Sequence, residues 1–275
     1  MEHEPLWVRP LIKWLEEVLL LNTGKLPAVE RLAAGNGFQE TLTAIVSYGK
    51  GHTEQWFFRK VSSTSRWCTI SGIYSALGIP TIKPIPFNDC TLVYASVEGV
   101  DLRDYQPETH TELLLFADAL GEAFITSILT ELGDRKPGNM ILSKRLSGKG
   151  YFITHIDFDK SLYIPWYAKV IDRHRFIKYS FRRLALPWAD QLNDNLRSAF
   201  LERITNSAER YLQALLRPKT RTPEDLKYNY LNETIPASGI IFPWDQDMLR
   251  FAYRQLAYWN KAGPKEIRRQ IVRLL

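Results

Sequence analysis

Cysteine is scarce in this chain, and a long uncharged apolar run is missing. Only Cys68 and Cys90 occur among 275 residues, which excludes a disulfide framework and favours a reducing compartment. The two cysteines and five histidines also form no zinc-binding pattern. Lys13, Glu16 and Glu17 interrupt the N-terminal apolar run, so it is not typical of a signal peptide, and no later stretch is apolar enough to span a bilayer. We therefore expect a soluble, cytoplasmic protein.

Positive charge is in excess, with a formal net charge of +6 and an isoelectric point of about 9.2. Lysine and arginine concentrate in residues 169–184 and again in 265–273. This balance is compatible with an anionic partner such as a nucleotide, a phosphorylated substrate, a nucleic acid or a membrane surface. The alternative for both stretches is an ordinary solvated helix face.

The order of elements predicts a β-rich part followed by a helical part. Helical spacing of apolar residues predicts helices over 6–22 and 109–133, with a brief helix around Trp67 and Ile70. Apolar stretches bounded by turns predict strands over 41–48, 54–61, 90–97, 139–144 and 151–158, and three prolines make 77–86 an extended linker. We therefore predict an α+β fold with one part over 1–97 and a second over 98–275.

Asp134, Lys136 and Asn139 lie in the segment GDRKPGNMIL, between the long helix and the next strand. Phosphoryl transfer needs an aligned acceptor hydroxyl, a carboxylate that orients it or takes its proton, and cations that neutralise phosphate charge. Asp134 can supply the carboxylate, and Lys136 can supply a point charge for the transferring phosphate. Asn139 offers an oxygen ligand to Mg²⁺, and its spacing from Asp134 is that of the kinase catalytic loop.

A second acidic motif, HIDFD, ends the strand predicted over 151–158. Asp157 follows the apolar strand residues, where a carboxylate can join Mg²⁺ to nucleotide phosphates. We expect Phe158 to pack under the helical core and fix the direction of that carboxylate. His155 has two interpretations, a hydrogen-bonding partner of the catalytic loop or a packed strand residue.

The segments GDRKPGNMIL and HIDFDKSL resemble the catalytic and metal-binding loops of the protein-kinase-like superfamily. The GDR…N and HIDF motifs are most similar to phosphoinositide 3/4-kinase-type enzymes, and DRKPGN also resembles protein kinases. The IDFDKS motif resembles aminoglycoside phosphotransferases and lipopolysaccharide-core sugar kinases. The strong resemblance covers residues 131–162. It implies a bilobal kinase-like fold with a small β-rich N-lobe, a larger helical C-lobe, and ATP and Mg²⁺ in the cleft between them.

A weaker resemblance, in order and spacing, extends over residues 33–162. It implies that Gly35 and Gly37 belong to a phosphate-covering loop, whose backbone N–H groups approach the phosphates. It also places Lys60 at the position of the third-strand lysine that binds the α- and β-phosphates. Arg59 is the alternative, because a shift of one residue along a strand exchanges the two faces.

The same resemblance implies a hinge at Tyr94, Ser96 and Val97, whose backbone would hydrogen-bond an adenine. It implies Asn139 and Asp157 as metal ligands. Asp159, two residues beyond Asp157, is a further expected ligand.

Two departures from the kinase pattern bear on function. No Asp or Glu occurs between Lys60 and Pro80, although the family's lysine usually pairs with a carboxylate on the helix after its strand, so Glu40 is a substitute. Asp159 stands where protein kinases have a glycine, and no Ala-Pro-Glu motif follows. These features favour a kinase for a small molecule, a sugar or a lipid headgroup over a regulated protein kinase.

Three alternatives to that function stay open. The first is an atypical protein Ser/Thr kinase, and the second is a nucleotide-binding pseudokinase or scaffold, because a fold does not establish activity. The third is an anion- or nucleic-acid-binding module that uses aromatic and arginine side chains in 167–184 to stack bases. Such a module would not need the clustered acidic residues.

Overall fold

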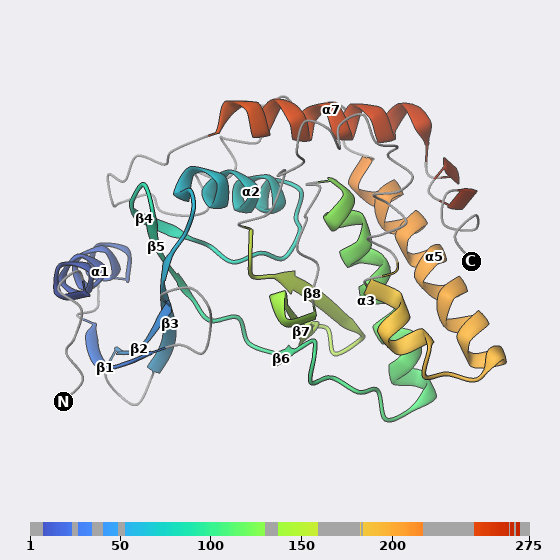
Figure 1. The fold of residues 1–275 in the computed structure, drawn as a ribbon, viewed down its shortest axis with the longest axis horizontal. Coiled ribbons are helices and arrows are strands. Elements are labelled where there is room, and N and C mark those ends of the chain that lie inside the picture. The colour runs from blue at the N-terminus through green and yellow to red at the C-terminus, as the bar shows by residue number, and fades with distance from the viewer. Residues whose placement is uncertain are drawn as a thin grey trace.

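The computed structural model divides into a sheet-rich N-terminal part and a helical C-terminal part (Figure 1). It describes residues 8–23, 27–34, 41–48, 53–129, 137–158, 182, 184–216, 245–263, 265–266 and 268–269. The basic stretch 169–184 lies outside these residues except for positions 182 and 184, as does most of 265–273.

An antiparallel five-stranded sheet forms the N-terminal part. Its strands, in the spatial order β1-β2-β3-β5-β4, are β1 (Ala28–Ala34), β2 (Thr41–Ser47), β3 (Thr53–Lys60), β5 (Thr91–Ala95) and β4 (Ile85–Asn88). Strand β3 lies in the middle, where Arg59 is opposite Thr41 of β2 on one side and Leu92 of β5 on the other. Pairing on both sides fixes which face of the sheet each β3 side chain occupies.

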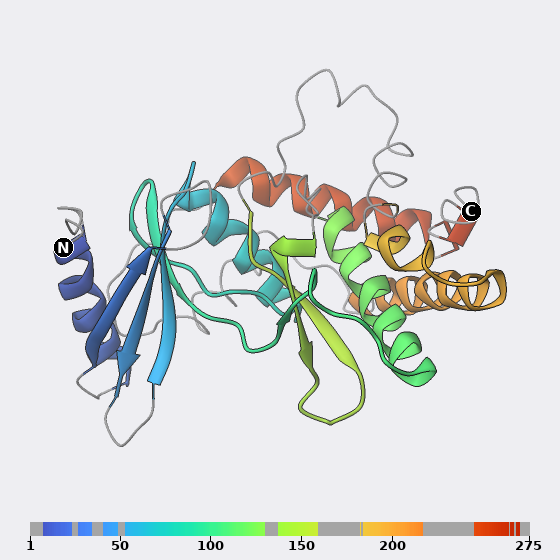
Figure 2. The ribbon, with the colours of Figure 1, turned by 60° about the horizontal axis from the view of Figure 1, so that its bottom comes forward.

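Helix α1 (Val8–Thr23) packs against this sheet and forms a small separate core with it (Figure 2). Leu11, Leu15 and Val18 recur at helical spacing and are buried. They share one apolar cluster with Trp56 and Phe58 of β3. This cluster occupies one face of the sheet and leaves the other face for the rest of the molecule.

Helix α2 (Thr64–Ala76) follows β3 and is buried on nearly every side, including Trp67, Ile70 and Tyr74. Ser63 caps its first turn, because its Oγ accepts a hydrogen bond from the Arg66 backbone N–H at 3.4 Å. A helix that is buried all round shows no amphipathic period, which is why the sequence indicated only a brief helix here.

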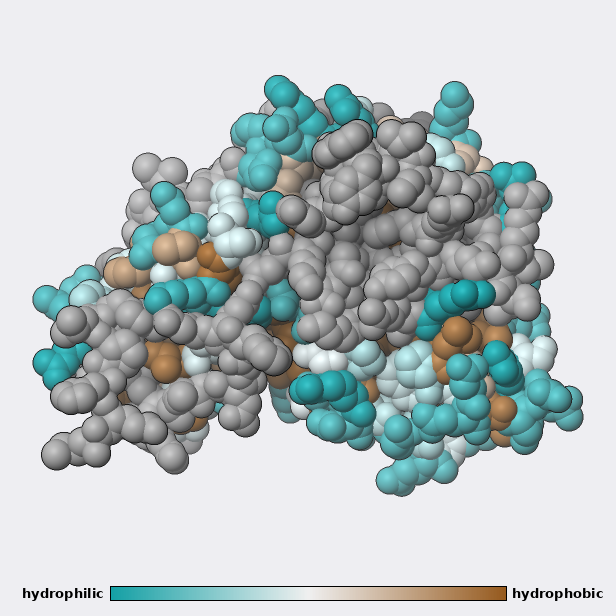
Figure 3. Space-filling view, viewed as in Figure 1, coloured by the Kyte–Doolittle hydropathy of each residue, from teal (hydrophilic) through white to brown (hydrophobic). Residues whose placement is uncertain are grey.

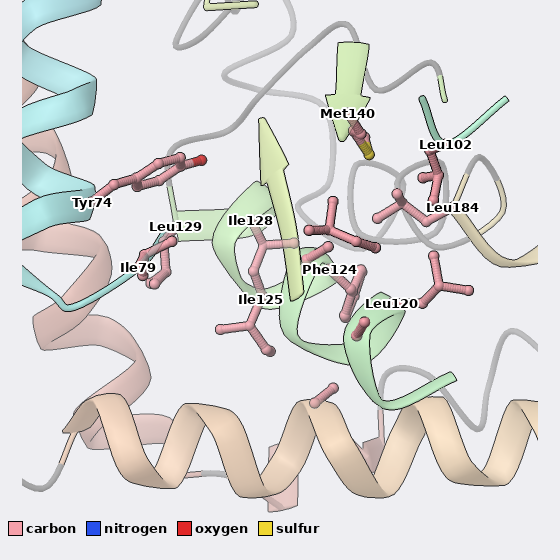
Figure 4. Close-up of a cluster of buried hydrophobic side chains, with 14 of the residues drawn as sticks. Tyr74, Ile79, Leu102, Leu120, Phe124, Ile125, Ile128, Leu129, Met140 and Leu184 are labelled. Carbon is pink, nitrogen blue, oxygen red and sulfur yellow. The ribbon is translucent and has the colours of Figure 1, made fainter. Parts of the chain in front are cut away.

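The C-terminal part is built around helix α3 (His110–Leu129). A three-stranded sheet in the order β6-β7-β8 lies beside α3, with the 3-10 turn η1 leading into β7, and α5 and α7 are the other long helices. The bounds are β6 (Val100–Asp101), η1 (Pro137–Asn139), β7 (Met140–Lys144), β8 (Tyr151–His155), α5 (Asp194–Leu216) and α7 (Gln246–Ala262). Figure 4 shows α3 side chains such as Phe124 and Ile128 in a cluster with Met140 of β7, and Tyr74 of α2 at its edge.

The predicted α+β fold, with a β-rich first part and a helical second part, is confirmed by the structure. The predicted elements appear with shifted ends, and the structure adds β1, β4 and the short β6. Strand β4 begins at the end of the segment predicted as a linker; it is an edge strand, where Pro86 is tolerated. The larger core crosses residue 97, because Trp67 and Tyr94 share one cluster with Phe116 and Phe158.

The described surface in the view of Figure 3 is largely hydrophilic, with small and separate apolar patches. Among the residues that the structure describes, no helix is long and apolar enough to cross a membrane.

Gly121 gives a test of the packing between α3 and α5. A Cβ at this position would lie 2.5 Å from the Ile204 carbonyl oxygen and 2.8 Å from the Ser207 Cβ, so the two helices approach too closely for any side chain. We expect Gly121→Ala to lower the free energy of unfolding in urea by about 1–3 kcal/mol. In an open helix interior the same substitution raises stability, and such a rise would contradict this close approach.

Candidate active site

The β7–β8 hairpin brings Asn139 and Asp157 to one end of the small sheet. Met140 pairs with His155, and beyond that pair the Ile156 N–H donates to the Asn139 carbonyl oxygen at 3.0 Å. Asn139 is thus hydrogen-bonded to the residue before Asp157, and the hairpin brings Asn139 and Asp157 close together although they are 18 positions apart in the sequence. An amide oxygen and a carboxylate are hard oxygen donors, which is the donor chemistry that Mg²⁺ prefers.

An ion pair joins this hairpin end to the N-terminal sheet. The Arg59 Nη2 donates to Asp157 Oδ2 at 2.9 Å, and the two side chains are only 13% and 18% exposed. Such a partly buried charge is costly without a partner, so each of the two groups stabilises the other in this position. This contact joins residues that are 98 positions apart in the sequence and links β3 to the segment that follows β8.

Alternation along β3 decides which of its two cations faces Asp157. Phe58 belongs to the core shared with α1, whereas Phe57 packs against the larger core. Lys60 therefore lies on the face of Phe58, and Arg59 lies on the face of Phe57. The structure places Arg59, which the sequence offered as the alternative, beside the predicted metal ligand, and Lys60 on the opposite side of the strand.

Trp67 of α2 lies against the same guanidinium. The Arg59 Cζ is 4.9 Å from the centre of the Trp67 ring, within the range of a cation–π contact. Phe158 meets that ring edge-on at 5.3 Å, and Tyr94 stacks on it with a centroid distance of 6.0 Å. The expected packing of Phe158 is therefore observed, with a fully buried ring that also contacts Tyr74 at 5.8 Å.

Sequence reasoning missed Trp67 as a site residue. The sequence did contain an indication of this role. No acidic residue occurs on α2, so this helix can offer the guanidinium of Arg59 only an apolar or hydroxyl-bearing partner. This indication could not be used, because it requires knowing which face of β3 Arg59 occupies, and both faces of that strand carry large apolar residues.

His155 is a packed strand residue. It is fully buried, its Nε2 lies 2.9 Å from the Thr126 Oγ1 of α3, and Thr81 pairs with it in a parallel bridge. Because the Thr126 hydroxyl donates its proton to the Ala123 carbonyl oxygen at 2.9 Å, it accepts from the ring, which assigns the proton to Nε2. His155 thus holds the β7–β8 hairpin against the central helix.

The predicted hinge connects β5 to the small sheet. The Tyr94 side chain is buried against α2, and the Ser96 N–H donates to the Gln55 carbonyl oxygen at 2.7 Å, so that amide continues the sheet. Val97 packs against the larger core. At Gly99 the backbone has φ 152°, and a Cβ would overlap the Leu142 backbone, so the hinge passes β7 too closely for another residue.

Five predicted site residues lie outside the described residues. They are Gly35, Gly37, Asp134, Lys136 and Asp159. The substitute partner Glu40 lies outside them as well. Within the described part of the chain, no three His, Cys, Asp or Glu side chains gather as a metal site, and Asn139 and Asp157 remain the oxygen donors at the hairpin end.

Comparison with known proteins finds one kind of similarity. No family model matches the chain, and no curated protein matches it. Among solved structures, the chain is similar to a Helicobacter pylori proinflammatory kinase, CtkA, with 13% sequence identity and a TM-score of 0.38. The similarity covers 84% of this chain and 94% of the other.

The Arg59–Asp157 contact predicts an energetic coupling that can be measured. In a double-mutant cycle of Arg59→Met and Asp157→Ala, we expect a coupling of about 1–2 kcal/mol in urea unfolding, because both charges are mostly removed from water. The matched control is Arg250 and Asp247, a surface pair at 3.7 Å with 69% and 94% exposure, where about 0–0.5 kcal/mol is expected. Equal couplings for the two pairs would show that the inter-lobe contact is not formed in solution.

Proposed function

We propose that this chain is an ATP- and Mg²⁺-dependent phosphotransferase that transfers the γ-phosphate to a hydroxyl group of a small molecule, a sugar or a lipid headgroup. The observation that carries the proposal is the meeting of Arg59, Asn139 and Asp157 where the sheet and the β7–β8 hairpin come together. A cation beside oxygen donors for a metal is the arrangement that binding of a metal–nucleotide complex requires.

Each residue has a role in this proposal. Asn139 and Asp157 would hold Mg²⁺, with Asp159 as a further ligand, and the bound ion would neutralise phosphate charge. Arg59 binds the α- and β-phosphates, in the role that the sequence resemblance gave to Lys60. A guanidinium suits this role because its planar set of N–H donors can bind a carboxylate and a phosphate oxygen together.

Asp134 and Lys136 act on the transferred group. Asp134 orients the acceptor hydroxyl and takes its proton as the new O–P bond forms and the bond from the γ-phosphorus to the β–γ bridging oxygen breaks. Lys136 neutralises charge on the moving phosphoryl group. The products are the phosphorylated acceptor and ADP.

The acceptor class follows from the sequence around Asp159. The missing glycine after Phe158 and the missing Ala-Pro-Glu motif support a non-protein acceptor. Incubation of the chain with γ-labelled ATP and cell extract, sorted into protein, lipid and soluble fractions, identifies the class. Label in protein would favour the Ser/Thr kinase alternative, and no label together with no ATPase activity would favour the pseudokinase.

Two carboxylates should have separable effects on phosphate transfer. We expect Asp157→Ala to reduce transfer to background while the chain stays folded, because the metal loses its carboxylate ligand. We expect Asp134→Asn to keep ATP binding and to lower transfer by about 10²- to 10⁴-fold, because only the proton acceptor is lost. Initial rates and ATP titrations measure both, with the exposed Asp247→Ala as the control. Wild-type rates for Asp157→Ala would make the site assignment wrong.

The two cations of β3 give a direct test of the phosphate contact. Arg59→Met should raise the KM for Mg-ATP by at least tenfold, since a charge-assisted phosphate contact is lost. Lys60→Met changes the neighbouring residue on the other face of the strand and should change KM by less than about threefold. The reverse order of these effects would return the phosphate-binding role to Lys60.

A further inference from the structure

Helix α2 cannot supply the acidic partner that a strand cation has in kinases. It runs from Thr64 to Ala76 without an Asp or Glu, and its described side chains from Trp67 to Tyr74 are all buried. The position that faces Arg59 is occupied instead by the indole of Trp67. We propose that Trp67 is the positioning residue of the phosphate-binding cation, and that its ring face takes the place of the missing carboxylate. This inference rests on the proposed function.

The indole is held firmly enough to act as a platform. Trp67 has no exposed surface, and Phe158 and Tyr94 contact its ring at 5.3 Å and 6.0 Å. The helix that carries it is tied to the C-terminal part, because the Asp245 N–H donates to the Thr69 Oγ1 at 2.9 Å. Asp245 is the N-cap of α7, which runs along α2 in Figure 1.

The chemistry of arginine explains why a ring face is sufficient here. A lysine ammonium is a point charge that is readily deprotonated when buried, so a carboxylate keeps it charged and directed. A guanidinium stays protonated in proteins, and its planar group stacks on aromatic faces. The ring therefore fixes the plane of Arg59 without accepting its in-plane N–H donors, and one of these donors already reaches Asp157.

In this arrangement, the packing of the surrounding side chains determines where the guanidinium of Arg59 lies. Arg59 contacts the indole of Trp67 and the carboxylate of Asp157, the indole contacts Phe158, and Phe158 is the chain neighbour of Asp157. A displacement of Trp67 would therefore reach both the phosphate-binding cation and the predicted metal ligand. Arg59 binds phosphates before and during transfer, so its misplacement raises KM more than it lowers kcat.

The test compares variants at Trp67 with matched variants at Trp188. Trp188 is also a buried tryptophan, 5% exposed, but it packs on Phe116 at 4.9 Å, away from the cation. We expect Trp67→Leu to raise the KM for Mg-ATP by about 2- to 30-fold, which is the range expected for the loss of a cation–π contact. The change in kcat should be smaller. Trp67→Phe should recover part of the affinity for Mg-ATP. Trp188→Leu should lower the melting temperature about as much as Trp67→Leu does and leave KM unchanged.

Arginine and tryptophan should also act as a pair. Arg59→Lys should raise KM in the wild-type background and have a smaller effect in the Trp67→Leu background, because the ring that favours the guanidinium is gone. If Trp67→Leu does not fold, Trp67→Phe and direct titration with a non-hydrolysable ATP analogue decide the question.

The outcomes separate the two proposals. A wild-type chain that binds no ATP overturns the proposed function and the inference with it. A wild-type chain that binds and transfers, with KM unchanged in both Trp67 variants, overturns the inference alone. Loss of kcat at constant KM would show that Trp67 only stabilises the fold.

Discussion

The contact between Arg59 and Asp157 determines how the two parts of this molecule meet at the candidate site. Strand β3 is central in its sheet, so its pairing with β2 and β5 leaves Arg59 no choice of face. The opposing face is filled by the apolar cluster with α1. Arg59 therefore faces the second part, where the carboxylate of Asp157, just beyond the end of β8, compensates its charge.

The aromatic side chains around this ion pair make its geometry rigid. Trp67, Tyr74 and Phe158 are fully buried, and Trp67 and Tyr74 of α2 both contact Phe158, which follows β8. Large rings in a close-packed core have few alternative positions, so Phe158 fixes the backbone at Asp157. His155 adds a polar tie from the same strand to α3 through Thr126. The β7–β8 hairpin is thus fixed from two sides, by the aromatic cluster and by the central helix.

The same packing distinguishes this site from the kinase pattern that its sequence resembles. There, a carboxylate on the helix after the strand partners the cation, and a movement of that helix can make or break the pair. In this chain α2 belongs to the larger core, and its Thr69 bonds the N-cap of α7. A helix held in this way favours a constantly assembled site over a switch.

The sequence alone determined the α+β order of elements, the long central helix, the hairpin of β7 and β8, and the grouping of Asn139 with Asp157. These features are local, since each depends on periodicity, on turns such as the one at Gly148 and Gly150, or on a motif within a few tens of residues. Strand β4 and the length of α2 were not predictable, because an edge strand with a proline and a helix buried all round lack the usual periodic signals.

Only the tertiary structure placed Arg59, rather than Lys60, beside Asp157 and brought Trp67 against it. Neighbouring residues on a strand differ only in the face they occupy, and both faces of β3 are apolar, so its sequence pattern is the same in either register. The face that Arg59 occupies depends on α1 covering one side of the sheet and on Trp67 of α2 and Asp157 lying against the other. Those contacts join residues that are far apart in the chain, and no local pattern records them.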